Sequence, residues 1–126
     1  MIDHVSLPVR DLERSKAFYE AVLSTIGFKK MMDMPSTVGF GRKHPAFWLN
    51  HRPQVNQSGI DDGFHVCLRA PSVDEVQAFH AAAIAEGATC DGQPGPRPQY
   101  SPSYYAAFIR DRDGNRIEVV TFVKAS

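Results

Sequence analysis

Three residues that lie far apart in the chain carry side chains suited to binding a divalent metal: His4, His65 and Glu118. Two neutral imidazoles and one carboxylate form a ligand set that leaves about half of an octahedral shell open to water or substrate. A metal bound in this way can chelate two neighbouring substrate oxygens and stabilise an enolate or alkoxide. With Fe(II), the same ligands also allow O₂ to bind beside a catechol-like substrate. Each of these residues, taken alone, is more simply interpreted as a surface side chain. Only their positions relative to one another can indicate whether they form a metal site.

An internal repeat places the two histidines at equivalent positions. His4 precedes Phe18 by 14 positions, His65 precedes Phe79 by 14 positions, and the two pairs are 61 residues apart. Each histidine begins a short segment in which apolar and other residues alternate, the pattern typical of a strand. Equivalent strand positions rarely arise by chance, and the repeat therefore favours a shared metal site.

A helix is predicted after each of these strands. The first has Asp11 as its N-cap and ends at Gly27, and the second begins with Ser72 and Glu75 as a capping box and ends at Gly87. Both have apolar residues at helical spacing on one face. The shorter strands that follow are expected at residues 28–32, 37–41, 46–51, 88–90, 104–109 and 116–123. Each half is thus β-α-β-β-β, with a hairpin turn at Asp113-Gly114-Asn115.

The proline-rich segment 91–103 is predicted to be a long loop. It borders the open side of the sheet, so it is either a lid over a site or a stiff connector.

Strand alternation predicts which residues share a face with the metal ligands. Val5, Leu7 and Val9 should pack on the first helix, which leaves His4 and Ser6 on the opposite face. The same reasoning gives a candidate substrate pocket made of Ser6, Trp48, Asn50, Cys67, Arg69, Tyr104 and Tyr105, with only one of the two tyrosines facing inward. Trp48 would form a flat apolar wall, and Arg69 would pair with an anionic substrate. The alternative for Trp48 and the tyrosines is ordinary core packing, and the alternative for Arg69 is a solvated position at the end of a strand.

The bulk composition excludes several classes of function. The 126 residues fit one domain, and 14 basic residues balance 14 acidic ones, so nothing attracts a nucleic acid. No apolar stretch approaches the roughly 20 residues that span a bilayer, and the N-terminus lacks the pattern of a signal peptide. Cys67 and Cys90 have no metal-type or disulfide-framework spacing and read as reduced thiols of a cytoplasmic protein.

At this point the sequence resembles the vicinal oxygen chelate superfamily of glyoxalase I, extradiol dioxygenases, fosfomycin-resistance thiol transferases and bleomycin-binding proteins. The matching segments are residues 2–5, 11–19, 64–66 and 108–118; the last is the most specific, although Arg112 stands where such proteins usually carry proline. The resemblance implies an α+β fold in which two βαβββ modules, about 1–59 and 60–126, curl into a half-open barrel within one domain of residues 1–126. It also implies His4, His65 and Glu118 as the metal ligands.

One ligand expected from the resemblance is missing. Glyoxalase I-like members carry a second carboxylate on the last strand of the first module, where it also serves as catalytic base. Here Trp48 or Asn50 occupies that place, depending on turn length, and neither acts as a base at neutral pH. A strict lactoylglutathione lyase is therefore disfavoured. The three-ligand set suits Fe, Mn, Zn or Ni, so the metal is not identified.

Two classes of function follow. The first is a metal-dependent enzyme, either a glyoxalase-like lyase or isomerase or an extradiol-type dioxygenase, that acts on a small oxygen-rich molecule. The alternative is a metal-free protein of the bleomycin-resistance type that binds a small molecule or sequesters a drug. No catalytic residue is assigned; His51 is a candidate acid or base, although His44, His51 and His80 are expected at the surface. The trio spans the repeat boundary, so the site forms where modules meet, either within one chain or between two exchanged chains. A homodimer is expected in either case, because open sheet edges need cover.

Overall fold

Two modules with the same order of elements make up the protein. The structure is a computed structural model that describes residues 1–54 and 63–124. The first module contains β1 (Val5–Val9), α1 (Leu12–Ser24), β2 (Lys29–Met34), β3 (Thr37–Gly41) and β4 (Pro45–His51). The second contains β5 (Val66–Arg69), α2 (Val73–Ala85), β6 (Thr89–Pro96), β7 (Tyr104–Arg110) and β8 (Arg116–Phe122). The predicted α+β fold of two βαβββ modules is confirmed, while the expected boundary near residue 59 lies outside the described residues.

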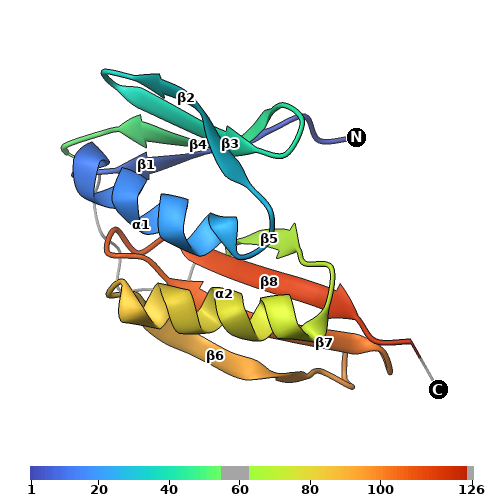
Figure 1. Cartoon of the computed structure of the whole chain (residues 1–126). Helices are drawn as coiled ribbons and strands as arrows, with labels where there is room; N and C mark the ends of the chain where they lie inside the picture. Colours follow the sequence, from blue (N-terminus) through green and yellow to red (C-terminus); the bar gives the residue numbers. More distant parts are fainter. Residues whose placement is uncertain (55–62, 125–126) are drawn as a thin grey trace.

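Each module forms its own four-stranded sheet (Figure 1). The strand order is β1-β4-β3-β2 in the first sheet and β5-β8-β7-β6 in the second. In both, the first strand runs parallel to the last strand of its module, and the remaining pairs are antiparallel. No described strand of one sheet pairs with a strand of the other, so a single chain does not close a barrel.

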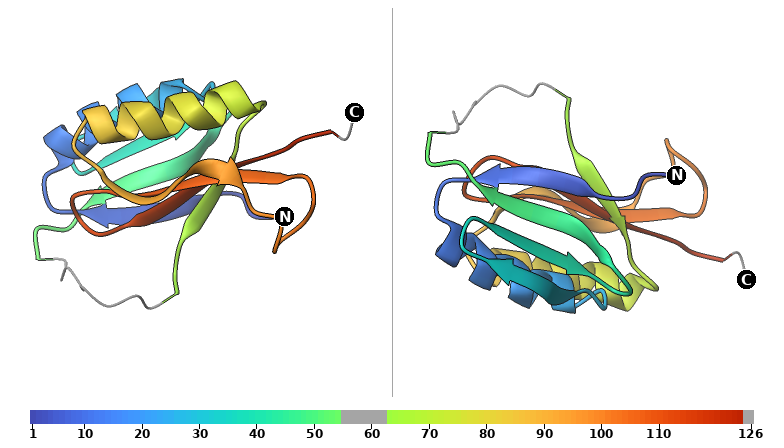
Figure 2. Two further views of the ribbon diagram at one scale, coloured as in Figure 1. Left: turned by 90° about the horizontal axis from the view of Figure 1, so that it is seen from below. Right: turned by 90° about the horizontal axis from the view of Figure 1, so that it is seen from above.

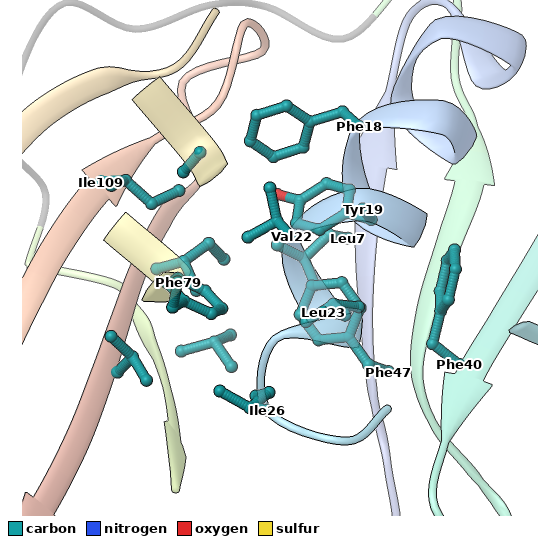
Figure 3. Packing of buried hydrophobic residues seen from close by; sticks show 14 of the residues in the cluster. Leu7, Phe18, Tyr19, Val22, Leu23, Ile26, Phe40, Phe47, Phe79 and Ile109 are labelled. Carbon is teal, nitrogen blue, oxygen red and sulfur yellow. The ribbon is translucent and has the colours of Figure 1, made fainter. Parts of the chain in front are cut away.

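The two sheets and two helices share one hydrophobic core. Figure 2 shows α1 and α2 side by side along one side of the molecule. Leu7 and Phe47 of the first sheet, Tyr19 of α1, Phe79 of α2 and Ile109 of the second sheet all lie in this core (Figure 3). Because the helix-covered faces of both sheets point into the same core, the opposite faces point outward from it. We call these outward surfaces the open faces.

The first predicted helix cap is confirmed and the second differs. The Asp11 carboxylate accepts a hydrogen bond from the backbone N–H of Arg14 at 3.1 Å, as an N-cap should. Ser72 makes no side-chain bond to the helix backbone, because its hydroxyl donates to the Glu75 carboxylate instead. The predicted capping box at α2 is therefore not formed. Neither described helix, each of 13 residues, is long and apolar enough to cross a membrane.

The predicted long loop from residue 91 to residue 103 is wrong over its first half. β6 continues to Pro96 and pairs with β7 along an irregular register. Prolines are tolerated here because β6 is the edge strand of its sheet, where some backbone N–H groups have no ladder partner. The remaining turn is held by the Arg97 N–H bond to the Tyr104 carbonyl at 2.8 Å. A lid of the predicted length is thus not available.

A buried carboxylate joins the β7–β8 turn to the first module. The Tyr19 hydroxyl of α1 donates to Asp111 at 2.6 Å, and Asn115 donates to Asp111 from its backbone N–H and its side chain at 2.8 and 2.9 Å. Beside them, the Arg10 backbone N–H and guanidinium both donate to Asp113, at 2.9 and 3.0 Å. These contacts, here called the inter-module clamp, fix the second module against the first.

Gly41 is expected to be intolerant of a side chain. A Cβ atom added at Gly41 would lie 1.9 Å from the carbonyl oxygen of His44, a backbone atom of the β3–β4 turn that cannot move alone. We expect Gly41→Ala to lower the free energy of unfolding by about 2 kcal/mol or more, measured by urea denaturation. Gly95→Ala is the control, because the nearest atom to its Cβ would be the flexible Arg97 side chain at 3.4 Å. Equal stability of the two variants would contradict this prediction.

Candidate metal centre

The structure brings two of the three predicted ligands together on the open face of the second sheet. The Nε2 atom of His65 lies 2.9 Å from Oε1 of Glu118. Two ligand atoms that each lie about 2.1 Å from a metal, at a right angle to each other, are about 3 Å apart. The pair, here called the half-site, therefore fits two adjacent positions of a metal's coordination shell. The Glu118 side chain is only 4% exposed, whereas the His65 side chain is 40% exposed and can be reached from outside.

Two further side chains surround the Glu118 carboxylate. The Tyr104 hydroxyl donates to Oε2, the oxygen that does not face His65, and so orients the carboxylate. Cys67 is the strand partner of Glu118 in the β5–β8 pairing. Burial, followed by the charge of Glu118, raises the pKa of the Cys67 thiol to about 12. Burial, followed by the hydrogen bond to Glu118, raises the pKa of Tyr104. Both groups hold their protons at neutral pH, so the thiol is no nucleophile there.

The third predicted ligand, His4, shares a groove with His65 but does not complete the half-site. His4 and His65 both line a groove of about 410 Å³ near the starts of β1 and β5, but Glu118 is not part of its lining. Nδ1 of His4 is instead 2.7 Å from the carboxylate of Asp3. Within residues 1–54 and 63–124 of one chain, no three His, Cys, Asp or Glu side chains are grouped so that they hold a metal.

The strand register shows which residue of the first module is equivalent to Glu118. Ser6 and Cys67 are equivalent in the 61-residue repeat; Ser6 pairs with Trp48, and Cys67 pairs with Glu118. Trp48 therefore occupies the position of a second carboxylate ligand. Its ring lies close against Gly39, where an added Cβ would come within 2.9 Å of the indole. Asn50 lies further along β4, where it accepts a hydrogen bond from the Thr37 hydroxyl at 2.9 Å.

The remaining pocket candidates divide between the two faces of the second sheet. Tyr104 belongs to the open face, while the Tyr105 hydroxyl accepts a bond from Gln77 of α2 at 3.0 Å and so lies on the helix side. The Arg69 guanidinium lies over the ring of Phe122, 4.6 Å from its centroid. One expectation about histidines is wrong: His80 is 7% exposed, because α2 turns it toward the second sheet, where its Nε2 is 3.2 Å from the Cys90 sulfur.

Three open-face residues were absent from the predicted pocket. Phe108 is the strand partner of Glu118, and its ring centroid lies 6.3 Å from that of His65. Phe122 packs edge-on against Tyr104. Both share the strand parity of Tyr104 and Glu118, so alternation alone would have placed them there. Arg97 lies over Phe108, with its Cζ 5.5 Å from the ring centroid. Strand alternation could not indicate its face, because Arg97 follows the last residue of β6.

Comparison with known proteins establishes the family. The model of the glyoxalase/bleomycin resistance protein/dioxygenase superfamily matches residues 1–119. The chain belongs to this superfamily. Among solved structures, a glyoxalase/bleomycin resistance protein from Albidiferax ferrireducens T118 is 34% identical with a TM-score of 0.82, over 94% of this chain and 96% of that one. None of the curated proteins compared with the chain matches it.

More distant members of the glyoxalase/bleomycin resistance protein/dioxygenase superfamily share the fold. The fosfomycin resistance protein FosX from Listeria monocytogenes has a TM-score of 0.70 at 16% identity, covering 95% of this chain and 91% of that one. A mutant of FosX, complexed with Mn(II) and 1S,2S-dihydroxypropylphosphonic acid, has a TM-score of 0.69 at 17% identity, covering 94% and 87%. At these identities the likeness concerns the fold alone.

Proposed function

We propose that this superfamily member is a metal-dependent enzyme that acts on a small oxygen-rich molecule, with the metal held by His65 and Glu118 of one chain and His4 of a second copy. The His65–Glu118 pair, 2.9 Å apart on an open face, carries the proposal. The superfamily match and the Mn(II) complex of the FosX mutant support a divalent metal, for which Fe, Mn, Zn and Ni remain candidates.

The chain's own groups would define the reaction at such a site. A bound metal would supply Lewis acidity toward two neighbouring substrate oxygens. Tyr104 keeps the Glu118 carboxylate oriented, and the position equivalent to Glu118 in the first module is the indole of Trp48. Trp48 supplies an apolar wall and cannot accept a proton. These features favour an extradiol-type dioxygenase, or a lyase that needs no second carboxylate, over a glyoxalase I-type isomerase.

A second copy of the chain is proposed because the two open faces of one chain point away from a common core. His4 precedes β1 of the first sheet, whereas the half-site lies on the second sheet. Large apolar side chains are exposed near both, including Ile2 at 82% and Phe64 at 66%. A two-fold dimer that seats the first open face of one chain on the second open face of its partner covers these side chains and brings His4 to the half-site.

Metal analysis tests the proposed function. After loading with Mn(II) or Fe(II) and removal of excess metal, the wild type is expected to retain close to one equivalent per chain, and His65→Ala less than about a tenth of an equivalent. His44→Ala is the matched control, because His44 lies outside the half-site, with Nε2 3.3 Å from the carbonyl oxygen of Asp3. A wild type that retains less than about a tenth of an equivalent would overturn the enzyme proposal and favour the metal-free binding protein.

A further inference from the structure

A cysteine and a histidine meet on the helix-covered side of the second sheet, away from the candidate metal centre. The Nε2 atom of His80 on α2 lies 3.2 Å from the sulfur of Cys90 on β6, the strand beside α2 (Figure 1). Cys90 is the strand partner of Ile109, a residue of the shared core, so its side chain lies on the face that α2 covers. The contact between His80 and Cys90, here called the thiol pair, therefore belongs to neither open face.

The two members of the thiol pair differ in their access to solvent. His80 is 7% exposed, whereas Cys90 is exposed and carries a free thiol. β6 is the edge strand of the second sheet, so no further described strand of the chain lies over Cys90. The proposed dimer would cover the open faces and leave this side of the molecule accessible. A small reagent can therefore reach the sulfur of Cys90, and the imidazole of His80 lies behind it.

The His80 imidazole is placed to take the thiol proton. Among the described residues, the Cys90 sulfur is the one hydrogen-bond partner of its ring. Burial lowers the pKa of His80, so the ring is uncharged at neutral pH and has one nitrogen free to accept a proton. In the tautomer that leaves Nε2 unprotonated, the Cys90 thiol donates to it; in the other tautomer, the Nε2–H group donates to the sulfur and stabilises its anion. Both favour attack by Cys90, because the thiolate is the nucleophilic form of cysteine.

We propose that Cys90 is a site of reversible modification by small disulfides, with His80 as the base that activates it. The Sγ–H proton of Cys90 passes to Nε2 of His80 as Sγ attacks one sulfur of the disulfide. The S–S bond of the disulfide breaks, and the departing thiolate takes the proton from His80 and leaves as a thiol. Cys90 is thereby oxidised to a mixed disulfide while half of the small disulfide is reduced, and an excess of thiol reverses the exchange. The site requires no metal, so it is independent of the proposed function.

Reaction of the full chain with the disulfide of mercaptoethanol, which carries no charge, tests this inference. Peptide mass spectrometry follows the adduct at each cysteine over time. We expect His80→Gln, which keeps a polar side chain but removes the base, to slow the reaction of Cys90 about tenfold or more. Cys67 is the internal reference, because it lies beside Glu118 on the opposite face of the second sheet, and its rate should not change. The same substitution at a histidine of the β3–β4 turn, His44→Gln, should leave both rates unaltered.

A second measurement needs no variant and decides the matter if His80→Gln does not fold. Unfolding in urea removes all cover from Cys90 but separates it from His80. Cys90 of the folded wild type should therefore react about tenfold or more faster than Cys90 of the unfolded chain, whereas an ordinary exposed thiol would react no faster when folded. A folded rate no higher than the unfolded one, or equal rates for Cys90 in the wild type and in folded His80→Gln, would overturn the proposal.

Discussion

Mixed dimers of His4→Ala chains and Glu118→Gln chains are expected to recover metal binding that each variant lacks alone. In the proposed dimer, each site takes His4 from one chain and His65 with Glu118 from the other. A homodimer of either variant therefore has two broken sites. A mixed dimer has one site with both defects and one that is intact, because the intact site combines the unchanged halves of the two chains.

The amount of metal expected per chain follows from random pairing of the two kinds of chain. Co-expression of the two chains in equal amounts gives half of the dimers mixed, so metal analysis should find about a quarter of an equivalent per chain, against nearly none for either variant alone. The matched control combines His65→Ala with Glu118→Gln. Both of these changes lie in the same half-site, so every dimer has two broken sites and no metal should return. Recovery equal to this control would show that chains do not share the site and would contradict the proposed dimer.

Asp111→Ala is expected to cause a large loss of stability although Asp111 lies outside the candidate metal centre. Asp111 is 7% exposed and accepts hydrogen bonds from Tyr19, Asn115 and the Asp113 backbone. Burial raises the pKa of the Asp111 carboxyl, and the bonds from Tyr19 and Asn115 act in the opposite direction. Removal of the carboxylate leaves several donors of the inter-module clamp without an acceptor, at a cost of about 1–3 kcal/mol for each that stays buried. We expect a loss of roughly 3 kcal/mol or more in urea denaturation.

Asp91→Ala provides a control with the same change of residue. The Asp91 carboxylate pairs with Arg110 at 3.5 Å and Arg116 at 2.9 Å, but its side chain is 21% exposed and all three groups reach solvent. Such a pair contributes about 1 kcal/mol or less. If Asp111→Ala proved no more destabilising than Asp91→Ala, the inter-module clamp would not be a stabilising contact between the modules.

The repeat and strand alternation were sufficient to predict the fold and half of the candidate site. The spacing of His4 and His65 relative to Phe18 and Phe79 identified the modules, and parity placed Glu118 on the face opposite the helices. The end of β6 was not predictable in this way, because prolines usually end a strand. Pro94 and Pro96 lie in an edge strand, and a sequence does not show which strand of a sheet lies at its edge.

Alternation also could not show how the two open faces are arranged. It gives the face on which a residue lies, but the direction of that face depends on how the helices pack. Here Leu23 of α1 and Phe79 of α2 enter one shared core (Figure 3), so the open faces of a chain point outward. Among the described residues of one chain, His4 therefore does not group with both His65 and Glu118. The position of Arg97 was not predicted for a related reason. Its guanidinium is held by the backbone carbonyls of Gly95 and Gln93, and a pattern of side chains does not show where backbone carbonyls lie.

An indole in one module and a carboxylate at the equivalent strand position of the other make the two halves of the proposed site unlike. If both modules presented a carboxylate, the two halves of the proposed site would be alike. A chelating molecule with two similar oxygens would then bind in two equivalent orientations. With Trp48 in one half and Glu118 in the other, the halves differ in shape and charge. In the proposed site, a molecule with two similar oxygens would therefore contact different groups in its two orientations, and the two orientations would bind with different affinities.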